Sequence, residues 1–170
     1  MVIGGGNTAI DAATQARRLG AEEATIVYRR GPEHMPATHK EQAWAQTSGV
    51  AIRHWLAPLR LGGLNGHVAG VVCARTCLGA DGKLVVTDQH ITIGADMVLK
   101  AVGQQLLPTP LDGAAVPAVA NGRIVVDEDR ETSLPGVFAG GDCITGADLT
   151  VSAVQDGKLA AAAIDRMLRR

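Results

Sequence analysis

Glycines near the start of the chain have the spacing of a phosphate-binding turn. Gly4, Gly6 and Ala9 fit the pattern G-x-G-x-x-G/A, directly after the apolar residues Val2 and Ile3. In this pattern the first glycine makes a tight turn, the second lets the backbone approach a pyrophosphate, and the third small residue packs a helix on a strand. The free N–H groups of that helix would face the phosphates. A glycine turn between a strand and a helix also occurs without a nucleotide, and this alternative stays open.

The residues after the next expected strand bear on which nucleotide the turn would hold. The apolar run at residues 24–28 is followed by Arg29 and Arg30. These arginines lie about 25 residues after Gly4, near the spacing of about 20 at which dinucleotide folds place a ribose-binding residue. An acid there would bind the 2′-hydroxyl of NAD, whereas two guanidinium groups can bind a 2′-phosphate. The pair favours NADP, unless both arginines are solvated charges at a strand end.

A second cluster of glycines and an acid lies near the other end of the chain. Residues 137–142 read V-F-A-G-G-D, and an expected helix begins at about Thr150 and Val151. Gly141 would let the chain approach a ligand, and the Asp142 carboxylate could accept hydrogen bonds from a sugar-like hydroxyl. The free N–H groups of the helix could face an electron-rich ring. The alternative is a plain turn in which Asp142 caps a helix. Two such clusters in one chain indicate two cofactors.

The elements expected to position the first cluster alternate between strands and helices. One helix is expected at residues 9–19, with Asn7 and Thr8 as its caps. A second helix at residues 39–48 precedes a strand at residues 50–56. The buried face of the second helix is expected to carry Ala43, Trp44 and Thr47.

Shorter β-rich runs, separated by polar turn signals, follow and predict an antiparallel meander. They lie at residues 68–76, 83–86 and 90–93. Residues 96–102 predict a buried strand that ends at Gly103, and residues 108–122, rich in Pro, Ala and Gly, predict a linker. The remaining expected elements are strands at residues 124–126 and 137–139, and a long helix at residues 150–168 that is interrupted at Asp156 and Gly157.

Composition excludes several classes of protein. With 46% hydrophobic residues, 19% charged residues and a net charge of −1, the chain predicts a packed core without a basic face for nucleic acid. The sequence contains neither a bilayer-length apolar run nor a leader pattern, and it has only three cysteines, so a cytoplasmic location is expected. Cys73 and Cys77 are expected to share one face of a strand as ordinary thiols, and no metal site is expected. The short first strand suggests that Met1 lies inside a longer reading frame.

Five segments together resemble one family. They are residues 2–11, residues 28–37 with Y-R-R and M-P-A, residues 101–103 with A-V-G, residues 132–143 with T-S-L-P-G-V-F-A-G-G-D-C, and residues 149–158 with L-T-V-S-A-V-Q-D-G-K. This combination resembles the flavoprotein subunit of glutamate synthase and the related flavin–NAD(P) part of dihydropyrimidine dehydrogenase.

The resemblance implies an α/β fold made of two dinucleotide-binding domains. Residues 1–103 would be a Rossmann-like NAD(P)-binding domain with an antiparallel β-meander, and residues 104–170 the C-terminal part of a discontinuous FAD-binding domain. Carried onto this sequence, the cofactor-binding residues would be Gly4, Gly5, Gly6, Asn7 and Thr8 for the pyrophosphate, Arg29 and Arg30 for the adenosine ribose, Gly103 in A-V-G, Gly141 and Asp142 for the ribityl or pyrophosphate region of FAD, and Thr150 and Val151 for the isoalloxazine.

The resemblance also implies a reaction, in which a hydride passes from NAD(P)H to FAD and electrons leave through iron–sulfur clusters to glutamate synthesis or pyrimidine reduction. An iron–sulfur or synthase subunit would be the partner, and a homodimer stays open. No nucleophile–base pair is present, which fits a reaction that depends on orientation. The iron–sulfur cysteine motifs and the FAD fingerprint of the family are missing, so the chain alone is expected to be inactive. The alternative is a stand-alone nucleotide-binding or interaction module without turnover.

Overall fold

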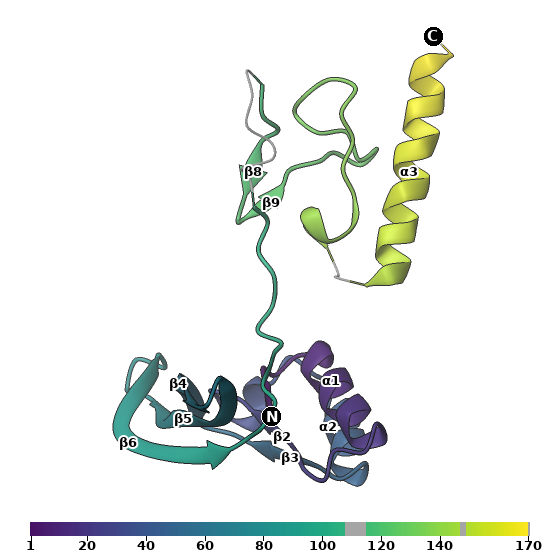
Figure 1. The fold of residues 1–170 in the computed structure, drawn as a ribbon. Helices are drawn as coiled ribbons and strands as arrows, with labels where there is room; N and C mark the ends of the chain where they lie inside the picture. Colours follow the sequence, from purple (N-terminus) through teal and green to yellow (C-terminus); the bar gives the residue numbers. More distant parts are fainter. Residues whose placement is uncertain (108–114, 147–148, 170) are drawn as a thin grey trace. The chain divides into compact units, whose positions relative to one another are not determined.

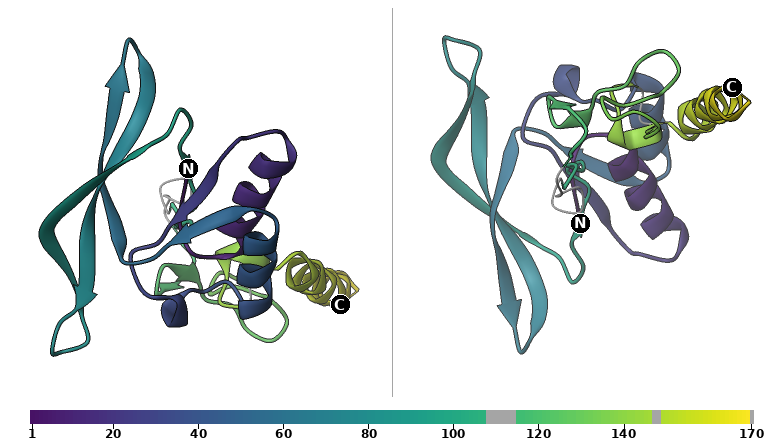
Figure 2. Two further views of the ribbon diagram at one scale, coloured as in Figure 1. Left: turned by 90° about the horizontal axis from the view of Figure 1, so that it is seen from below. Right: turned by 90° about the horizontal axis from the view of Figure 1, so that it is seen from above.

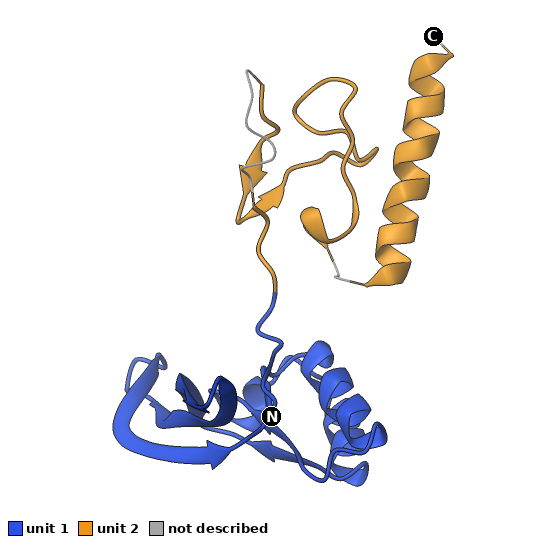
Figure 3. Cartoon of the chain, viewed as in Figure 1, with its two compact units in different colours: residues 1–103 blue, residues 104–170 orange. Residues whose placement is uncertain are grey.

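The computed structural model describes residues 1–107, 115–146 and 149–169. The chain forms two compact units, residues 1–103 and residues 104–170, which Figure 3 colours separately.

A parallel sheet forms the centre of the first unit. Its strands run in the order β3-β2-β1-β7, and each neighbouring pair is parallel. Parallel strands need crossover connections, and helices supply the first two, so the sequence pattern of alternating strands and helices becomes a Rossmann-like layer. The bounds are β1 (Val2–Ile3), α1 (Asn7–Arg18), β2 (Ala24–Val27), η1 (Pro32–His34), α2 (His39–Thr47), β3 (Val50–Arg53) and β7 (Leu99–Lys100).

The two faces of this sheet are covered by different elements. Figure 1 shows α1 and α2 on one face, where Ile10 and Ala13 of α1 and Ala45 of α2 are buried in one cluster with Ile26. Val27 packs on the other face in a second cluster, which includes Val71 and other residues of an antiparallel sheet. The sheet is therefore buried on both faces, as its Val and Ile content predicts.

The antiparallel sheet has three long strands in the order β4-β5-β6, and Figure 2 shows it as a twisted ribbon beside the parallel sheet. Its strands are β4 (Leu56–Leu64), β5 (His67–Leu78) and β6 (Leu84–Gly94). The predicted meander is thus present, but β6 is one strand where two runs were predicted. Residues 87–89 bulge opposite Arg75 and do not turn, because Thr87 donates a hydrogen bond to the Arg75 carbonyl at 3.0 Å. The sequence pattern did not predict β4 beyond Leu56, since its glycines and Pro58 are poor strand formers.

The same bulge separates the two cysteines of β5. The register shifts between Ala74 and Thr76, where residues 87–89 of β6 lie opposite Arg75. Cys73 is fully buried, and burial raises the pKa of its thiol, whereas Cys77 is exposed. That the two cysteines share a face of β5 stays a prediction. Among the described residues, no group of three or more His, Cys, Asp and Glu side chains is arranged to hold a metal ion.

Two further details of the first unit differ from the sequence prediction, although α2 begins at His39 as predicted. A capping box between Thr38 and Glu41 sets where α2 starts. From this start α2 buries Gln42 and Ala45. The predicted face is therefore wrong, and its residues Ala43, Trp44 and Thr47 are exposed. The strand predicted as buried at residues 96–102 is reduced to β7, an exposed edge strand.

The second unit consists mainly of loops and one long helix. Its elements are β8 (Val119–Ala120), which pairs with β9 (Arg123–Ile124), η3 (Gly141–Cys143) and α3 (Thr150–Leu168). Strand β8 falls inside the predicted linker, of which residues 108–114 lie outside the described part of the chain. Strand β9 overlaps the strand predicted at residues 124–126 only at Ile124. Residues 137–139 form no regular strand, only a bridge between Phe138 and Glu131. The helix α3 continues through Asp156 and Gly157, so the predicted interruption is wrong. None of the described helices is both long and apolar enough to span a bilayer.

Candidate functional site

The three glycines between β1 and α1 have different surroundings. Gly4 has a φ of +149°, and a Cβ atom there would overlap the carbonyl oxygen of Ala101. A Cβ atom on Gly5 would lie 2.5 Å from the ring of Tyr28. At Gly6, no atom of the described residues beyond its chain neighbours lies within 4 Å of that position. Gly4 and Gly5 are therefore required by packing, whereas Gly6 leaves an open approach to the backbone.

The open side of Gly6 coincides with the start of α1. Gly6 is the N-cap residue and has no side chain with which to accept hydrogen bonds from the first turn. The first N–H groups of α1 and the positive end of its dipole are thus available to an anion. Asn7 and Thr8 lie exposed in this first turn. The prediction that they cap the helix is wrong, because Asn7 is already its first residue.

The segment M-P-A, residues 35–37, packs against this glycine turn and stabilises it. The N–H of Ala37 donates to the Gly5 carbonyl at 3.0 Å, and Met35 and Ala37 are both buried. The hydroxyl of Tyr28 donates to the carbonyl of His34 at 2.7 Å, which holds the ring against Gly5. These residues of the family pattern therefore act by packing beneath the turn.

The other residues predicted for the first site lie at the same edge of the sheet. Because β1, β2 and β7 are parallel, their carboxyl ends meet at one edge, where ligands of open α/β sheets bind. Arg29 and Arg30 follow β2, and Gly103, with a φ of +96°, follows β7. Arg29 is exposed. The Nε atom of Arg30 is buried and has no hydrogen-bond partner among the described residues.

A histidine that sequence analysis did not single out also lies at the carboxyl edge of the parallel sheet. His54 follows β3, and its Nε2 atom is buried without a partner among the described residues. Desolvation by burial lowers its pKa, which the Glu33 carboxylate partly offsets. Its place directly after a strand is the signal that could have found it.

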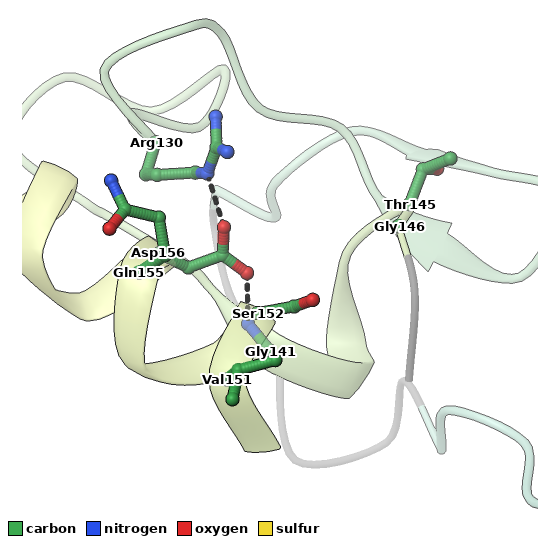
Figure 4. Close-up of a pocket in the computed structure, with 8 residues that line it drawn as sticks. All are labelled: Arg130, Gly141, Thr145, Gly146, Val151, Ser152, Gln155 and Asp156. Atoms are coloured by element: carbon green, nitrogen blue, oxygen red, sulfur yellow. Dashed lines mark hydrogen bonds and ion pairs between the residues drawn. The ribbon is translucent and has the colours of Figure 1, made fainter. Parts of the chain in front are cut away.

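The second unit contains an open pocket of about 340 Å³, shown in Figure 4. Of the residues predicted for the second site, Gly141 and Val151 line this pocket, whereas Asp142 and Thr150 do not. Asp142 is exposed, and its carbonyl accepts a hydrogen bond from Arg123 Nη1 at 2.7 Å. The lining residues that sequence analysis missed are Arg130, Thr145, Gly146, Ser152, Gln155 and Asp156.

Asp156 connects two other lining residues of this pocket, Gly141 and Arg130. Its Oδ2 atom accepts a hydrogen bond from the N–H of Gly141 at 2.9 Å, and its Oδ1 atom accepts one from Arg130 Nε at 2.8 Å (Figure 4). The Gly141 N–H, and after it the Arg130 side chain, lower the pKa of Asp156 below its usual range. The N–H of Gly141 is therefore not free for a ligand. Sequence analysis took Asp156 for a helix breaker, because the dipeptide Asp-Gly usually marks a turn.

Replacing Asp156 by Asn is expected to change how stability depends on pH. A carboxyl whose pKa is lowered by folding stabilises the fold above its unfolded pKa of about 3.9 and loses this effect as the pH falls through the lower folded pKa. Urea midpoints of the wild type and the variant should differ at neutral pH and converge towards about pH 2. A difference that stays the same at every pH would contradict the prediction.

Comparison with known proteins identifies the fold class. Residues 1–157 match the family described as pyridine nucleotide-disulphide oxidoreductase. Among solved structures, T. acidophilum thioredoxin reductase has a TM-score of 0.83 and 26% identity, over 99% of this chain and 52% of that one. The predicted α/β fold of a flavoprotein with two dinucleotide-binding domains is thus confirmed.

Curated relatives confirm the resemblance. The chain is 38% identical over 176 residues to the NADP(+)-dependent formate dehydrogenase subunit beta of Moorella thermoacetica, which covers 99% of this chain and 25% of that protein. It is 37% identical over 177 residues to the glutamate synthase (NADPH) small chain of Escherichia coli K12. This alignment covers 95% of this chain and 37% of that protein. The chain spans little more than a third of these relatives at most. Because the family model matches residues 1–157, this chain belongs to the pyridine nucleotide-disulphide oxidoreductase family.

Proposed function

We propose that this chain belongs to an FAD-dependent NAD(P)H oxidoreductase, in which residues 1–103 bind NADPH and residues 104–170 form part of the FAD site. The observation that carries the proposal is the turn at Gly6, where the backbone is open to a ligand at the N-terminus of α1. A pyrophosphate fits this place, because it needs close backbone approach and unpaired N–H groups. Gly4 to Thr8 would hold it.

The arginine pair supports NADPH over NADH. Arg29 and Arg30 follow β2 at the edge where the glycine turn lies, and Arg29 is exposed. Their guanidinium groups could donate charge-assisted hydrogen bonds to a 2′-phosphate. The names of both relatives cited above contain NADP or NADPH, which supports the same choice. Gly103 would line the same edge.

The pocket of the second unit would receive part of the flavin. Gly141 and Val151 line it, and the first turn of α3 begins at Thr150, so its N–H groups would face the ring as proposed from the sequence. Asp142 lies outside this pocket and would contact the ribityl or pyrophosphate region. When bound, the reduced nicotinamide supplies a hydride and the flavin accepts it. The residues of this chain bind and orient the two groups, and none is proposed as a catalytic acid or base.

The names of the relatives support a partner subunit. Both relatives cited above are subunits or chains of larger enzymes by name. We propose that the electrons pass to iron–sulfur centres in a partner subunit or domain, with glutamate synthesis as the first candidate destination and pyrimidine reduction as the second. The chain alone would bind NADPH without turnover.

The arginine pair provides the test. Changing Arg29 and Arg30 to Gln is expected to raise the Kd for NADPH at least about tenfold, because charge-assisted hydrogen bonds to the 2′-phosphate are lost. The Kd for NADH should change much less. Calorimetric titration of both nucleotides measures the two values.

Arg18→Gln is the matched control. Arg18 lies in the last turn of α1, where its guanidinium stacks 5.3 Å from the centre of the Trp44 ring. This control should bind NADPH as the wild type does. A wild type that binds neither nucleotide, or binds both equally well, would contradict the proposed cofactor.

A further inference from the structure

A buried charge lies in the middle of the long C-terminal helix. Asp156 is 8% exposed and is the only charged residue among the buried residues of the described chain. Burial of a carboxylate is costly unless it is paired and hydrogen-bonded. Both oxygens of Asp156 are engaged, by Gly141 and by Arg130. A buried, fully satisfied acid at this position indicates a role beyond helix formation.

The two residues that donate to Asp156, Gly141 through its backbone N–H and Arg130 through its side chain, both have left-handed backbone conformations. Gly141 has a φ of +73° and Arg130 a φ of +68°, which is unfavourable for a side chain such as that of Arg. The Arg130 carbonyl accepts a hydrogen bond from the N–H of Ala139 at 3.0 Å. The loop that contains Arg130, called the Arg130 loop, is therefore joined to the residue just before Gly140 and Gly141. One carboxylate thus connects α3, the glycine turn and the Arg130 loop.

The contact between the helix and the turn is close. A Cβ atom on Gly140 would lie 2.7 Å from the Cβ atom of Asp156. Arg130, Gly141 and Asp156 all line the pocket, together with Val151 and Ser152 from the first turn of α3. The shape of the pocket therefore depends on where Asp156 holds the turn and the guanidinium.

We propose that Asp156 is a positioning residue of the flavin site, which holds Gly141 in place and neutralises the Arg130 guanidinium at the pocket. This inference rests on the proposed function. Without the carboxylate, the Gly141 N–H loses its acceptor and Arg130 becomes an unpaired cation at the pocket. An unpaired positive charge beside a flavin stabilises its reduced, more negative form.

The test compares variants of the full-length protein. Asp156→Asn is expected to raise the Kd for FAD about tenfold, as the loss of a charged hydrogen-bond partner requires, and to raise the midpoint potential of the bound flavin. Arg130→Gln keeps the bond between Asp156 and Gly141 but removes the cation, so the potential should fall. A purely structural role for Asp156 would change the stability of both variants without shifts of opposite sign.

Asp165→Asn is the matched control, because Asp165 is an exposed acid of the same helix whose partner is Arg169 at 2.9 Å. Its Kd and potential should equal those of the wild type. A folded Asp156→Asn protein with unchanged Kd and potential would overturn the inference. Should that variant not fold, an unchanged potential in Arg130→Gln would overturn it. A wild type that binds no FAD would instead overturn the proposed function.

Discussion

Replacing Gly4 by Ala is expected to destabilise residues 1–103 by about 2 to 6 kcal/mol. A φ of +149° is costly for any residue with a side chain, by about 1 to 3 kcal/mol. The new methyl group would also overlap the carbonyl oxygen of Ala101. Relieving this clash would move β1 away from Ala101, whose N–H donates a hydrogen bond to the Ile3 carbonyl at 2.8 Å. Overpacking of this kind adds about 1 to 3 kcal/mol. Urea unfolding measures the loss.

Gly6→Ala is the matched control for this prediction. Gly6 has a φ of −91°, which Ala adopts readily, and the described structure leaves room for the methyl group. Its stability should change by no more than about 1 kcal/mol, while the Kd for NADPH rises because the methyl group obstructs the approach of the pyrophosphate. Equal destabilisation by the two substitutions would show that the glycines do not have separate roles.

Ile26→Ala is expected to cost about 2 to 5 kcal/mol of the free energy of unfolding, the usual range for a large core side chain. Ile26 is 0% exposed. It lies in β2 between Val2 of β1 and Ile52 of β3, and packs in the cluster that joins the parallel sheet to α1 and α2. The surrounding strands cannot collapse into the space that the side chain leaves, so a cavity remains.

Val86→Ala tests whether burial causes this loss. Val86 lies in β6 and is 52% exposed, so its substitution should change stability by less than about 0.5 kcal/mol. The two variants remove side-chain carbons from strands of the same unit. A similar cost for both would contradict the assignment of Ile26 to the core.

The features that sequence analysis predicted well are those determined by local chemistry. The turn at Gly4 to Gly6 and the helix after it follow from residues that are neighbours in the chain. The strand at residues 24–28 was placed to within one residue, because a run of β-branched side chains bounded by charges has few alternatives. The resemblance of five segments then supplied the fold class that no single segment could.

The features that it missed depend on contacts between distant residues. Residues 87–89 resemble a turn, but pairing with Arg75 on β5 keeps them inside β6. The buried face of α2 depends on the capping box at Thr38 and on the cluster that it joins. Asp156 was taken for a break, and only the approach of Gly141 and Arg130 explains why an acid is buried there. Tertiary partners decide each of these cases, and a single sequence does not show them.

The pairing of β1 with β7 has a consequence for the order of folding. Val2 pairs with Ile26 on one side and with Leu99 on the other. The second contact closes a loop about four times as long as the first, and the entropy of closing a loop grows with its length. Contacts between residues far apart in sequence form slowly. The Ala101 carbonyl meets Gly4 only after this closure. The glycine turn therefore reaches its final geometry late, when the antiparallel sheet has formed and brought its last strand back to the first.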